Sequence, residues 1–557
     1  SSHVKGLSAR APQYNQDGTL VVVTKPSLKE EAYFGDSYSL ELNAAYTQTF
    51  AEKHTIDAKA VFTVSENNGS YFWASRKDYL SATVDQLFAG SSIGMQNSGN
   101  SDEGGRMGLV GRLKYDFDSR YYIEGSFRYD GSDNFAPGHR WGFFPSVALA
   151  WDITEEPFFK NLNLKNVNLL KLRGSYGQTG TESGVNRFGY LSTYSLAENA
   201  ICIGGNLQSG FNEGALVSPE LLSWYTRNSL NYGIDVAFFN HRLKGSADYF
   251  FYVTKGGLVS PADRYVVPLG TALPQIKSEN EHRREGFEAS LRWDDKIGSG
   301  FYYEVGTNMT YYNNLYVKNQ GEALSDLKNP YKRSTHQTDY YGIMYMDNGL
   351  YQTPEQVLGV PRRLQSSATK LGDIAYEDIN GDGKIDGEDQ IRWGMPSAPH
   401  FTYGFDFVLG YKGFTLSGLL YGTGKRNMEF GVTTKKNEAI WVLNDYQLDY
   451  WREDNRDATF PRISLEALPN GSNNQAASTF WVKNASFLRL KNLTLEYDFK
   501  YKLLRNVKWL STCRANITGA NLFTISNVMD YFDPETTSTN GGYPVQRVYS
   551  LGVTIGF

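Results

Sequence analysis

The amino-acid sequence predicts an all-β protein, a transmembrane antiparallel β-barrel with long extracellular loops. Aromatic residues make up 15% of the chain, and segments along its whole length alternate apolar with small or polar residues. The connections between these segments are short after every second segment and mostly long after the others. Barrels combine these features, because they carry two aromatic girdles, one lipid-facing and one lumen-facing side per strand, short periplasmic turns and long extracellular loops.

The last ten residues of the chain show the alternation most clearly. Their apolar residues alternate with small or polar ones and are Tyr549, Leu551, Val553, Ile555 and Phe557. A period of two places these side chains on one face of a strand. A half-buried strand of a soluble sheet would look the same, so the barrel prediction depends on repetition of the pattern.

The pattern recurs about 16 times along the chain. In order, the predicted strands are 14–26, 38–49, 54–64, 109–117, 121–130, 143–151, 169–178, 230–238, 243–251, 284–294, 301–313, 401–410, 414–422, 492–499, 512–524 and 548–557. The first of these is weak. The others alternate clearly, and several adjacent pairs are joined by turns of two or three residues, as in antiparallel hairpins.

The lengths of the connections follow the parity of the strands. Even-numbered strands precede the links 51–53, 118–119, 153–168, 240–241, 295–300, 411–412 and 500–511, whereas odd-numbered strands precede long segments that include 65–106, 179–227, 254–283, 314–399 and 424–485. Outer-membrane barrels separate short and long connections onto opposite sides of the membrane. A soluble sandwich or propeller has no reason to do so.

Composition excludes several other classes of protein. No run of 18 apolar residues occurs, and the mean hydropathy is -0.46, so transmembrane helices are not expected. The net charge of -5 argues against a nucleic-acid partner. The two cysteines, Cys202 and Cys513, are far apart in sequence and indicate no disulfide framework.

Barrel closure requires more strands than the numbered residues supply. An open sheet edge cannot lie in hydrocarbon, because its N–H and C=O groups would lack partners, and a wide barrel must be plugged. Nothing in the sequence resembles a soluble plug domain, and no signal peptide begins at Ser1. We therefore expect residues 1–557 to be the C-terminal portion of a longer exported protein, with the plug and first strands preceding Ser1.

The segment 378–389 has the spacing of a twelve-residue calcium-binding loop. Gly383 at position 6 permits the sharp turn, and position 12 is Asp rather than the usual Glu, which lowers the expected affinity. The predicted oxygen ligands are Asp378, Asn380, Asp382, the Lys384 carbonyl, Asp386 and Asp389. The alternative is a solvated acidic turn that binds no ion. Strand parity places the loop outside the cell, so we expect a structural Ca²⁺ that fixes part of 314–399.

Other motifs give weaker indications. The seven histidines lie in no metalloprotease motif, and no nucleophile elbow or P-loop occurs, so no catalytic residues are predicted. The charged run 282–285 fits a solvated rim better than a binding site. Some loop aromatics could stack on sugars or peptides, although packing between loops is the better expectation; these are Trp224, Tyr225, Trp441, Tyr446, Tyr450 and Trp451.

Several longer motifs resemble the C-terminal part of SusC/RagA-type TonB-dependent outer-membrane transporters. In chain order they include RYDGSDNF with WGFFPS, NHRLKGSADYFFYVTKGGL, RREGFEAS, YYGIMYMDNGLYQTPEQ, GDIAYEDINGDGKIDGED, YGFDFVLGYKGFTLSGLLYGTG, ASFLRLKNLTLEYDF, TGANLFTI, YFDPET and the terminal LGVTIGF. This resemblance implies a 22-stranded barrel, an N-terminal plug and a TonB-engaging segment before it. It also implies a SusD-like surface lipoprotein as partner, and oligosaccharides or oligopeptides as cargo.

The leading functional hypothesis is active import of an oligomeric nutrient across the outer membrane of a Gram-negative bacterium, without catalysis by this chain. One alternative is an outer-membrane barrel enzyme, which no catalytic motif in the sequence supports. Another is a soluble calcium-binding surface adhesin, which the loop parity and aromatic content disfavour. The sequence does not distinguish glycan from peptide cargo, because specificity does not follow from fold.

Overall fold

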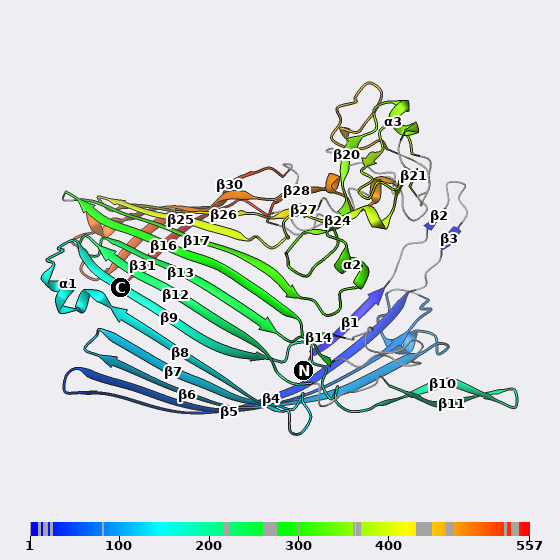
Figure 1. Cartoon of the computed structure of the whole chain (residues 1–557), viewed down its shortest axis with the longest axis horizontal. Coiled ribbons are helices and arrows are strands. Elements are labelled where there is room, and N and C mark those ends of the chain that lie inside the picture. The colour runs from blue at the N-terminus through cyan, green and yellow to red at the C-terminus, as the bar shows by residue number, and fades with distance from the viewer. Residues whose placement is uncertain are drawn as a thin grey trace.

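The structure, a computed structural model, is dominated by one large curved sheet (Figure 1). It describes residues 2–8, 13–14, 20–22, 26–80, 83–214, 222–259, 276–298, 300–359, 362–363, 369–429, 448–463, 473–528, 532–535 and 545–557. Seventeen strands belong to the large sheet, and every registered pair in it is antiparallel. The predicted all-β class is confirmed.

The strands of the large sheet follow one another in chain order around the wall. They are β1 (Ser2–Ser8), β4 (Ser27–Phe50), β5 (His54–Arg76), β6 (Gln96–Phe117), β7 (Tyr121–Ser132), β8 (Trp141–Asp152), β9 (Val167–Thr181), β12 (Tyr225–Phe238), β13 (Leu243–Lys255), β16 (Glu281–Ile297), β17 (Phe301–Lys318), β18 (Gln337–Thr338), β25 (Phe401–Tyr411), β26 (Phe414–Gly424), β29 (Phe487–Asp498), β30 (Thr512–Ser526) and β31 (Val548–Gly556). Each pairs with its neighbour, and the short β18 pairs with the end of β17 beside β25.

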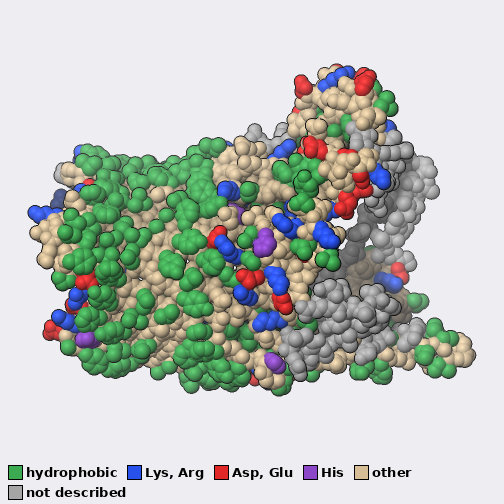
Figure 2. Space-filling view, viewed as in Figure 1, with side chains coloured by type: hydrophobic (Ala, Val, Ile, Leu, Met, Phe, Trp, Pro, Cys, Tyr) green, Lys and Arg blue, Asp and Glu red, His purple; other side chains and the backbone are tan. Residues whose placement is uncertain are grey.

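The two faces of the sheet differ in chemistry, as the alternation predicts. On β7 and β8, Ile123 pairs with Leu149 on one face, whereas Ser126 pairs with Ser146 on the other. The apolar side chains are exposed on the convex outer face, and Figure 2 shows them gathered on that face toward one end of the strands. The opposite, inner face is polar. Such a distribution suits a wall with lipid outside and water inside.

Short links and long connections lie at opposite ends of the strands. Links of two to four residues join β4 to β5, β6 to β7, β12 to β13, β16 to β17 and β25 to β26. The helix α1 (Pro157–Asn161) lies at this short-link end, together with the C-terminus (Figure 1). The long connections lie at the other, long-loop end. The predicted separation by parity is confirmed, although the β7–β8 connection at the long-loop end spans only 133–140.

Two expectations about the first strands are wrong. Residues 13–14 and 20–22 form a separate small hairpin, and the first strand of the large sheet is β1, which pairs with residues 27–33 of β4. β4, β5 and β6 also extend far beyond their predicted ends, to 24, 23 and 22 residues. A strand needs about 9–11 residues to cross a membrane, so these three continue past the rim. The predictions stopped where the apolar alternation stopped, but the polar residues beyond it remain paired.

Small elements make up the rest of the described chain. The additional strands are β2 (Gln13–Tyr14), β3 (Leu20–Val22), β10 (Tyr194–Ile203), β11 (Asn206–Glu213), β14 (Leu258–Val259), β15 (Ile276–Lys277), β19 (Gly342–Tyr345), β20 (Asp347–Leu350), β21 (Arg362–Arg363), β22 (Ile374–Tyr376), β23 (Lys384–Ile385), β24 (Gln390–Trp393), β27 (Asn427–Glu429) and β28 (Val482–Asn484). The helices α2 (Leu324–Lys328) and α3 (Pro354–Leu358) lie at the long-loop end. In the described residues, no helix is long and apolar enough to span a membrane.

The two longest connections pack together into one unit, here called the loop body: the described residues of 319–400 and 425–486. It stands above the long-loop end of the sheet in Figure 1. Its buried core draws on both connections and on Val528, with the members Tyr345, Ile374, Tyr376, Ile385, Met428, Phe460, Trp481, Ala485 and Val528. A core of this kind makes the loop body a folded structure in its own right.

Both cysteines are free, as the sequence predicts: Cys202 is exposed and Cys513 is half-buried.

Candidate functional site: the loop body and the inner face

The acidic segment 378–389 folds as a closed loop within the loop body. Asp378 accepts hydrogen bonds from the amides of Gly381 (2.7 Å) and Gly383 (2.8 Å). Gly383 has a φ of 81°, in the left-handed region that favours glycine. The sharp turn that the sequence predicts at position 6 is therefore present.

The end of the same loop is anchored by a buried carboxylate. Asp389 is 0% exposed and accepts hydrogen bonds from the amides of Ile379 (2.9 Å) and Asp386 (2.7 Å). Asn380 and Asp382 accept further amide hydrogen bonds, and Lys384 lies in β23, which pairs in parallel with β21. All six predicted ligand residues thus lie in one compact loop.

No cluster of three or more His, Cys, Asp or Glu side chains suited to a metal ion occurs among the described residues. The oxygens of the loop's side chains point toward its own amides rather than toward one common centre. An oxygen-only set with a Gly turn at position 6 remains chemically suitable for Ca²⁺. The calcium site stays a prediction.

A buried ion pair ties the two halves of the loop body together. Asp373, 2% exposed, contacts Arg462 Nε at 2.7 Å and accepts from Asn474 Nδ2 at 3.0 Å. Asp373 comes from the first connection, whereas Arg462 and Asn474 come from the second. Because a buried charge needs a partner, this contact specifies how the two connections meet.

A second buried charge joins the sheet to the segment after β30. Arg489 on β29 is 1% exposed and contacts Asp533 at 2.6 Å and Glu535 at 2.5 Å. Its Nε donates to Thr524 Oγ1 on β30 at 2.9 Å. The described residues 532–535 of the motif YFDPET, singled out in the sequence, are therefore held against the inner face by one arginine.

Several charged side chains on the inner face form ion pairs between strands. Arg173 on β9 contacts Asp235 on β12 at 2.8 Å and Asp248 on β13 at 3.0 Å. Arg292 on β16 similarly contacts Asp406 on β25 at 3.1 Å. These networks give the inner face a hydrated, polar surface, which suits a passage for water-soluble molecules.

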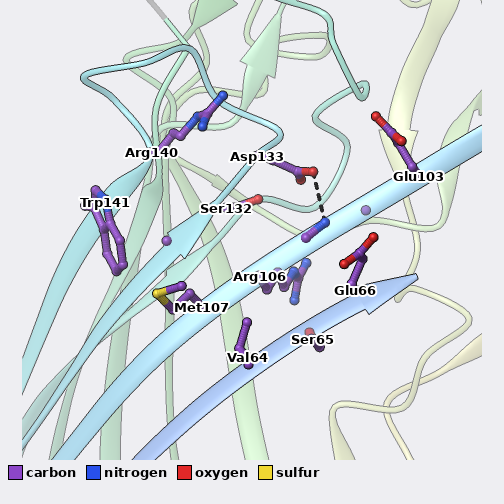
Figure 3. A pocket seen from close by; sticks show the side chains of 13 residues that line it. Val64, Ser65, Glu66, Glu103, Arg106, Met107, Ser132, Asp133, Arg140 and Trp141 are labelled. Atoms are coloured by element: carbon purple, nitrogen blue, oxygen red, sulfur yellow. Dashed lines mark hydrogen bonds between the residues drawn. The ribbon is translucent and has the colours of Figure 1, made fainter. Parts of the chain in front are cut away.

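One cavity opens where the β7–β8 connection meets the extended part of β6. It has a volume of about 440 Å³, and Figure 3 shows acidic and basic side chains around it, among them Glu66, Arg106 and Asp133. Asp133 accepts from the Gly105 amide at 2.9 Å and from Arg187 at 2.8 Å. Arg106 contacts Glu182. The charged groups that could bind a ligand here are thus largely engaged with one another.

A second cavity, of about 330 Å³, lies at the long-loop ends of β12, β13, β16 and β17. It includes the charged run that the sequence assigned to a solvated rim. His282 and Arg284 lie on the inner face, whereas Arg283 and Glu285 pair with each other on the outer face at 2.6 Å. Sequence reasoning missed Arg227, which lines the same cavity from β12. No local pattern connects residues so far apart.

Two of the six aromatic loop residues, Trp224 and Trp451, pack inside the protein, as expected. Trp224 packs between Phe135 and Phe144, with ring centroids 5.2 and 5.5 Å away. Trp451 is buried and donates to Gln352 Oε1 at 2.9 Å. Trp441 and Tyr446 lie outside the described residues.

Hydrogen bonding shifts the acidity of two loop carboxylates. Burial would raise the pKa of Asp339, but hydrogen bonds from His400 and Asn314 lower it below its usual value. Asn455 and Thr459 both donate to Asp449, and these bonds lower the pKa of that carboxyl. Both groups are therefore ionised at neutral pH.

Comparison with known families gives a match over nearly the whole chain. The family model described as "TonB dependent receptor-like, beta-barrel" matches residues 6–522. TonB-dependent receptor P3 of Formosa agariphila is 26% identical over 521 residues, which cover 88% of this chain and 49% of that protein. TonB-dependent receptor SusC of Bacteroides thetaiotaomicron is 27% identical over 465 residues, covering 80% of this chain and 43% of that protein.

Solved structures of the same fold agree with this result. The RagAB peptide importer in its open-open state superimposes with a TM-score of 0.78 at 21% identity, covering 100% of this chain and 58% of that one. Another RagAB peptide transporter structure gives 0.75 at 21% identity, covering 100% of this chain and 59% of that chain. The chain thus spans about half the length of the relatives it matches.

Proposed function

Because the chain belongs to the family of TonB-dependent receptor-like β-barrels, we propose that it forms the wall of a transporter that imports oligomeric nutrients. The predicted resemblance to SusC/RagA-type transporters is confirmed. The chain is an outer-membrane β-barrel of a Gram-negative bacterium. In the proposed role it is a conduit and performs no catalysis.

One observation supports this role above the others: the sheet separates an apolar outer face from a charged inner face. Outer residues such as Ile123 and Leu149 would contact lipid, while inner networks such as Arg173 with Asp235 and Asp248 would contact water. A wall built in this way can surround a hydrated passage for polar cargo.

We propose that energy reaches the passage through TonB. The TonB-engaging segment and the plug would belong to the part of the protein outside residues 1–557. A plug inside the barrel would contact the ion pairs of the inner face, so a pull on the plug could change access to the passage.

We further propose that a SusD-like surface lipoprotein docks on the loop body. The loop body has a buried core of its own, which is more structure than a pore rim requires. Long ordered loops usually carry function. The lipoprotein would capture cargo and close over the mouth of the barrel.

The cargo in this proposal is an oligosaccharide or an oligopeptide. RagAB is described as a peptide importer, and the likeness of this chain to RagAB concerns the fold alone. The loop 378–389 would hold a structural Ca²⁺ through Asp378, Asn380, Asp382, the Lys384 carbonyl, Asp386 and Asp389.

Growth assays test the proposed function. Deleting the gene for the complete protein should abolish growth on one or more members of a panel of glycans and peptides as sole carbon source. Complementation should restore growth only when TonB is present. Normal growth of the deletion strain on every member, with unchanged uptake of labelled oligomers, would contradict the proposal.

A further inference from the structure

The second cavity differs from the rest of the inner face in how its charges are arranged. Its lining comes from two cross-strand rows at the long-loop ends of β12, β13, β16 and β17. Arg227, Thr254, His282 and Tyr316 are in register in one row, and Tyr252, Arg284 and Asn314 in the next. The cavity has a volume of about 330 Å³.

Strand alternation places these side chains on the inner face. The outward residues next to them, Phe251 and Phe287, alternate with Tyr252 and Arg284 along β13 and β16. Because Phe287 is exposed on the apolar outer face, Arg284 points the other way. The cavity therefore opens toward the passage.

Three arginines line this cavity. Arg283 pairs with Glu285 on the outer face, whereas Arg227 and Arg284 form no ion pair with a carboxylate in the described part of the chain. Arg284 Nε donates to Asn314 Oδ1 at 2.6 Å, and its guanidinium lies 4.6 Å from the ring centre of Tyr312. Arg227 Nε donates to Thr254 Oγ1 at 3.4 Å, and its guanidinium lies 5.9 Å from the ring centre of Tyr252. Among the residues that the structure describes, none accepts from the terminal NH₂ groups of these two guanidinium groups.

Other arginines on the inner face of the strands do have carboxylate partners. They are Arg106, Arg112, Arg128, Arg173, Arg292, Arg489 and Arg514. Arg227 and Arg284 are therefore exceptions to a general pattern of the wall, and they occur together in one cavity.

The remaining charged groups of the cavity do not neutralise both arginines. Asp339 faces the cavity and is attracted by the charge of Arg284, but it also accepts from Asn314 and lies 3.4 Å from His400 Nε2. His282 stacks edge-on against Tyr316 with ring centroids 4.6 Å apart. Two arginines and one carboxylate leave an excess of positive charge.

We propose that this cavity binds a carboxylate group of oligomeric cargo through the paired guanidinium groups of Arg227 and Arg284. Planar guanidinium forks match carboxylate oxygens in bidentate geometry, and the adjacent tyrosines provide apolar surface beside the charge. The proposal deepens the proposed function, on which it rests, by assigning the passage a preference for acidic oligomers. The carboxylate could come from acidic amino acids or from uronic acids.

Binding measurements on the complete transporter, purified in mild detergent, test this proposal. The probes are tetraglutamate with its neutral counterpart tetraglutamine, and tetragalacturonate with neutral tetragalactose. At least one acidic probe should bind about tenfold or more tightly than its neutral counterpart, because a hydrogen bond from a guanidinium group to a carboxylate is stronger than one to a neutral amide or hydroxyl. The peptide and sugar arms distinguish the two sources of carboxylate.

Variants connect the preference to the cavity. The double variant Arg227→Gln with Arg284→Gln should lose the preference while keeping its affinity for neutral probes. Arg112→Gln is the matched control, since it removes a positive charge from the inner face at an arginine that is paired with Asp57. Arg284→Glu should weaken acidic probes further and favour tetralysine, a gain that misfolding cannot imitate.

Equal binding of acidic and neutral probes by the wild type would overturn the proposal. It would also be overturned if Arg112→Gln lost the preference for acidic probes as fully as the double variant does. Either result would still be compatible with the proposed import of neutral oligomers. Failure of the proposed function would instead appear as normal uptake of all oligomers in the deletion strain, which allows the two failures to be told apart.

Discussion

Single buried charges hold the extracellular part of this protein together. Asp373 and Arg489 are almost fully buried, and each contacts partners that are distant in sequence. Removing one partner of a buried ion pair typically costs about 3–5 kcal/mol, because the remaining charge is left without compensation. These residues therefore determine which loops meet.

The calcium prediction also concerns individual residues. Replacing Asp378 and Asp382 together with Ala should remove the predicted calcium and disorder 378–389, because both carboxylates close the loop and would supply ligands at about 2.3–2.6 Å. Elemental analysis after calcium-replete purification measures the ion, and hydrogen exchange measures the loop. The barrel should keep its resistance to detergent unfolding.

Asp454→Ala is the matched control for calcium, since Asp454 is an exposed loop aspartate outside 378–389. A wild-type protein without calcium would show that 378–389 is only a hydrogen-bonded turn.

Local stability around Asp449 should depend on pH. Hydrogen bonds from Asn455 and Thr459 lower the pKa of Asp449 in the folded protein. A lowered pKa stabilises the fold above the ordinary aspartate value of about 3.9, and this contribution is lost as the pH falls below that value. Hydrogen exchange at the Thr459 amide, corrected for intrinsic rate, should accelerate between about pH 4 and pH 2.

In Asp449→Asn this acceleration should disappear, whereas Glu453→Gln, an exposed neighbour, should behave as the wild type. If the wild type and both variants showed the same dependence of Thr459 amide exchange on pH, protonation of Asp449 would not be the cause of the acceleration.

At the scale of the elements, tight links set the register of the hairpins. Asp118 and Ser119, between β6 and β7, both have a φ of 55°. Gly413, between β25 and β26, has a φ of 87°, and a Cβ there would lie 2.9 Å from the Cβ of Tyr501. The left-handed backbone conformation is thus adopted by strained non-glycine residues in one link and by a required glycine in the other.

Opposite substitutions in these two links should have opposite effects. Ser119→Gly should stabilise the barrel by about 0.5–1 kcal/mol, because the left-handed conformation costs an L-residue about 1–2 kcal/mol and glycine's extra entropy offsets part of this. Gly413→Ala should destabilise it by at least about 1 kcal/mol. Urea unfolding in lipid vesicles measures both, and a shift of the same sign in both variants would contradict the backbone explanation.

At the scale of the whole molecule, the sheet has two edges. β1 covers only residues 27–33 of β4, and β31 is registered with β30 alone among the described strands. The outward residues of both edges are apolar and exposed, including Leu40, Leu42, Leu551 and Val553. Unpaired backbone groups in lipid cost several kcal/mol each.

We therefore expect β31 and the rest of β4 to pair with strands outside residues 1–557. In the complete protein, hydrogen exchange should be slow for the β31 amides that point away from β30. Disulfide formation between cysteines placed at Thr554 and Asn43 would instead indicate direct β31–β4 pairing, which would contradict this expectation.

The loop body should bind a surface lipoprotein. Purification of the complete protein through a tag in mild detergent should recover a SusD-like lipoprotein at near-equal stoichiometry, with an interface beyond about 2,000 Å², as in stable hetero-complexes. Trp481→Ala, which removes a buried aromatic from the core of the loop body, should reduce recovery of the lipoprotein while the barrel stays intact. If the wild-type barrel elutes intact but without a lipoprotein, the proposed binding of a SusD-like lipoprotein is refuted.

The sequence alone determined the features that are local. Alternation identified the long strands of the large sheet from β4 to β31 but not the two-residue β18. It also assigned side chains to the two faces and placed short and long connections on opposite ends. The spacing of 378–389 identified a closed acidic loop. These inferences succeed because side-chain direction in a strand and the geometry of a short loop depend on neighbouring residues.

Only the tertiary structure decided which distant segments meet. It extended β4, β5 and β6 beyond their apolar stretches, because polar strands in water show no alternation of hydrophobicity. It joined Asp373 to Arg462 in one loop body, and the register of three strands placed Arg227 and Arg284 in adjacent cross-strand rows of one cavity. Such contacts depend on long-range pairing and burial, which no local pattern in the chain encodes.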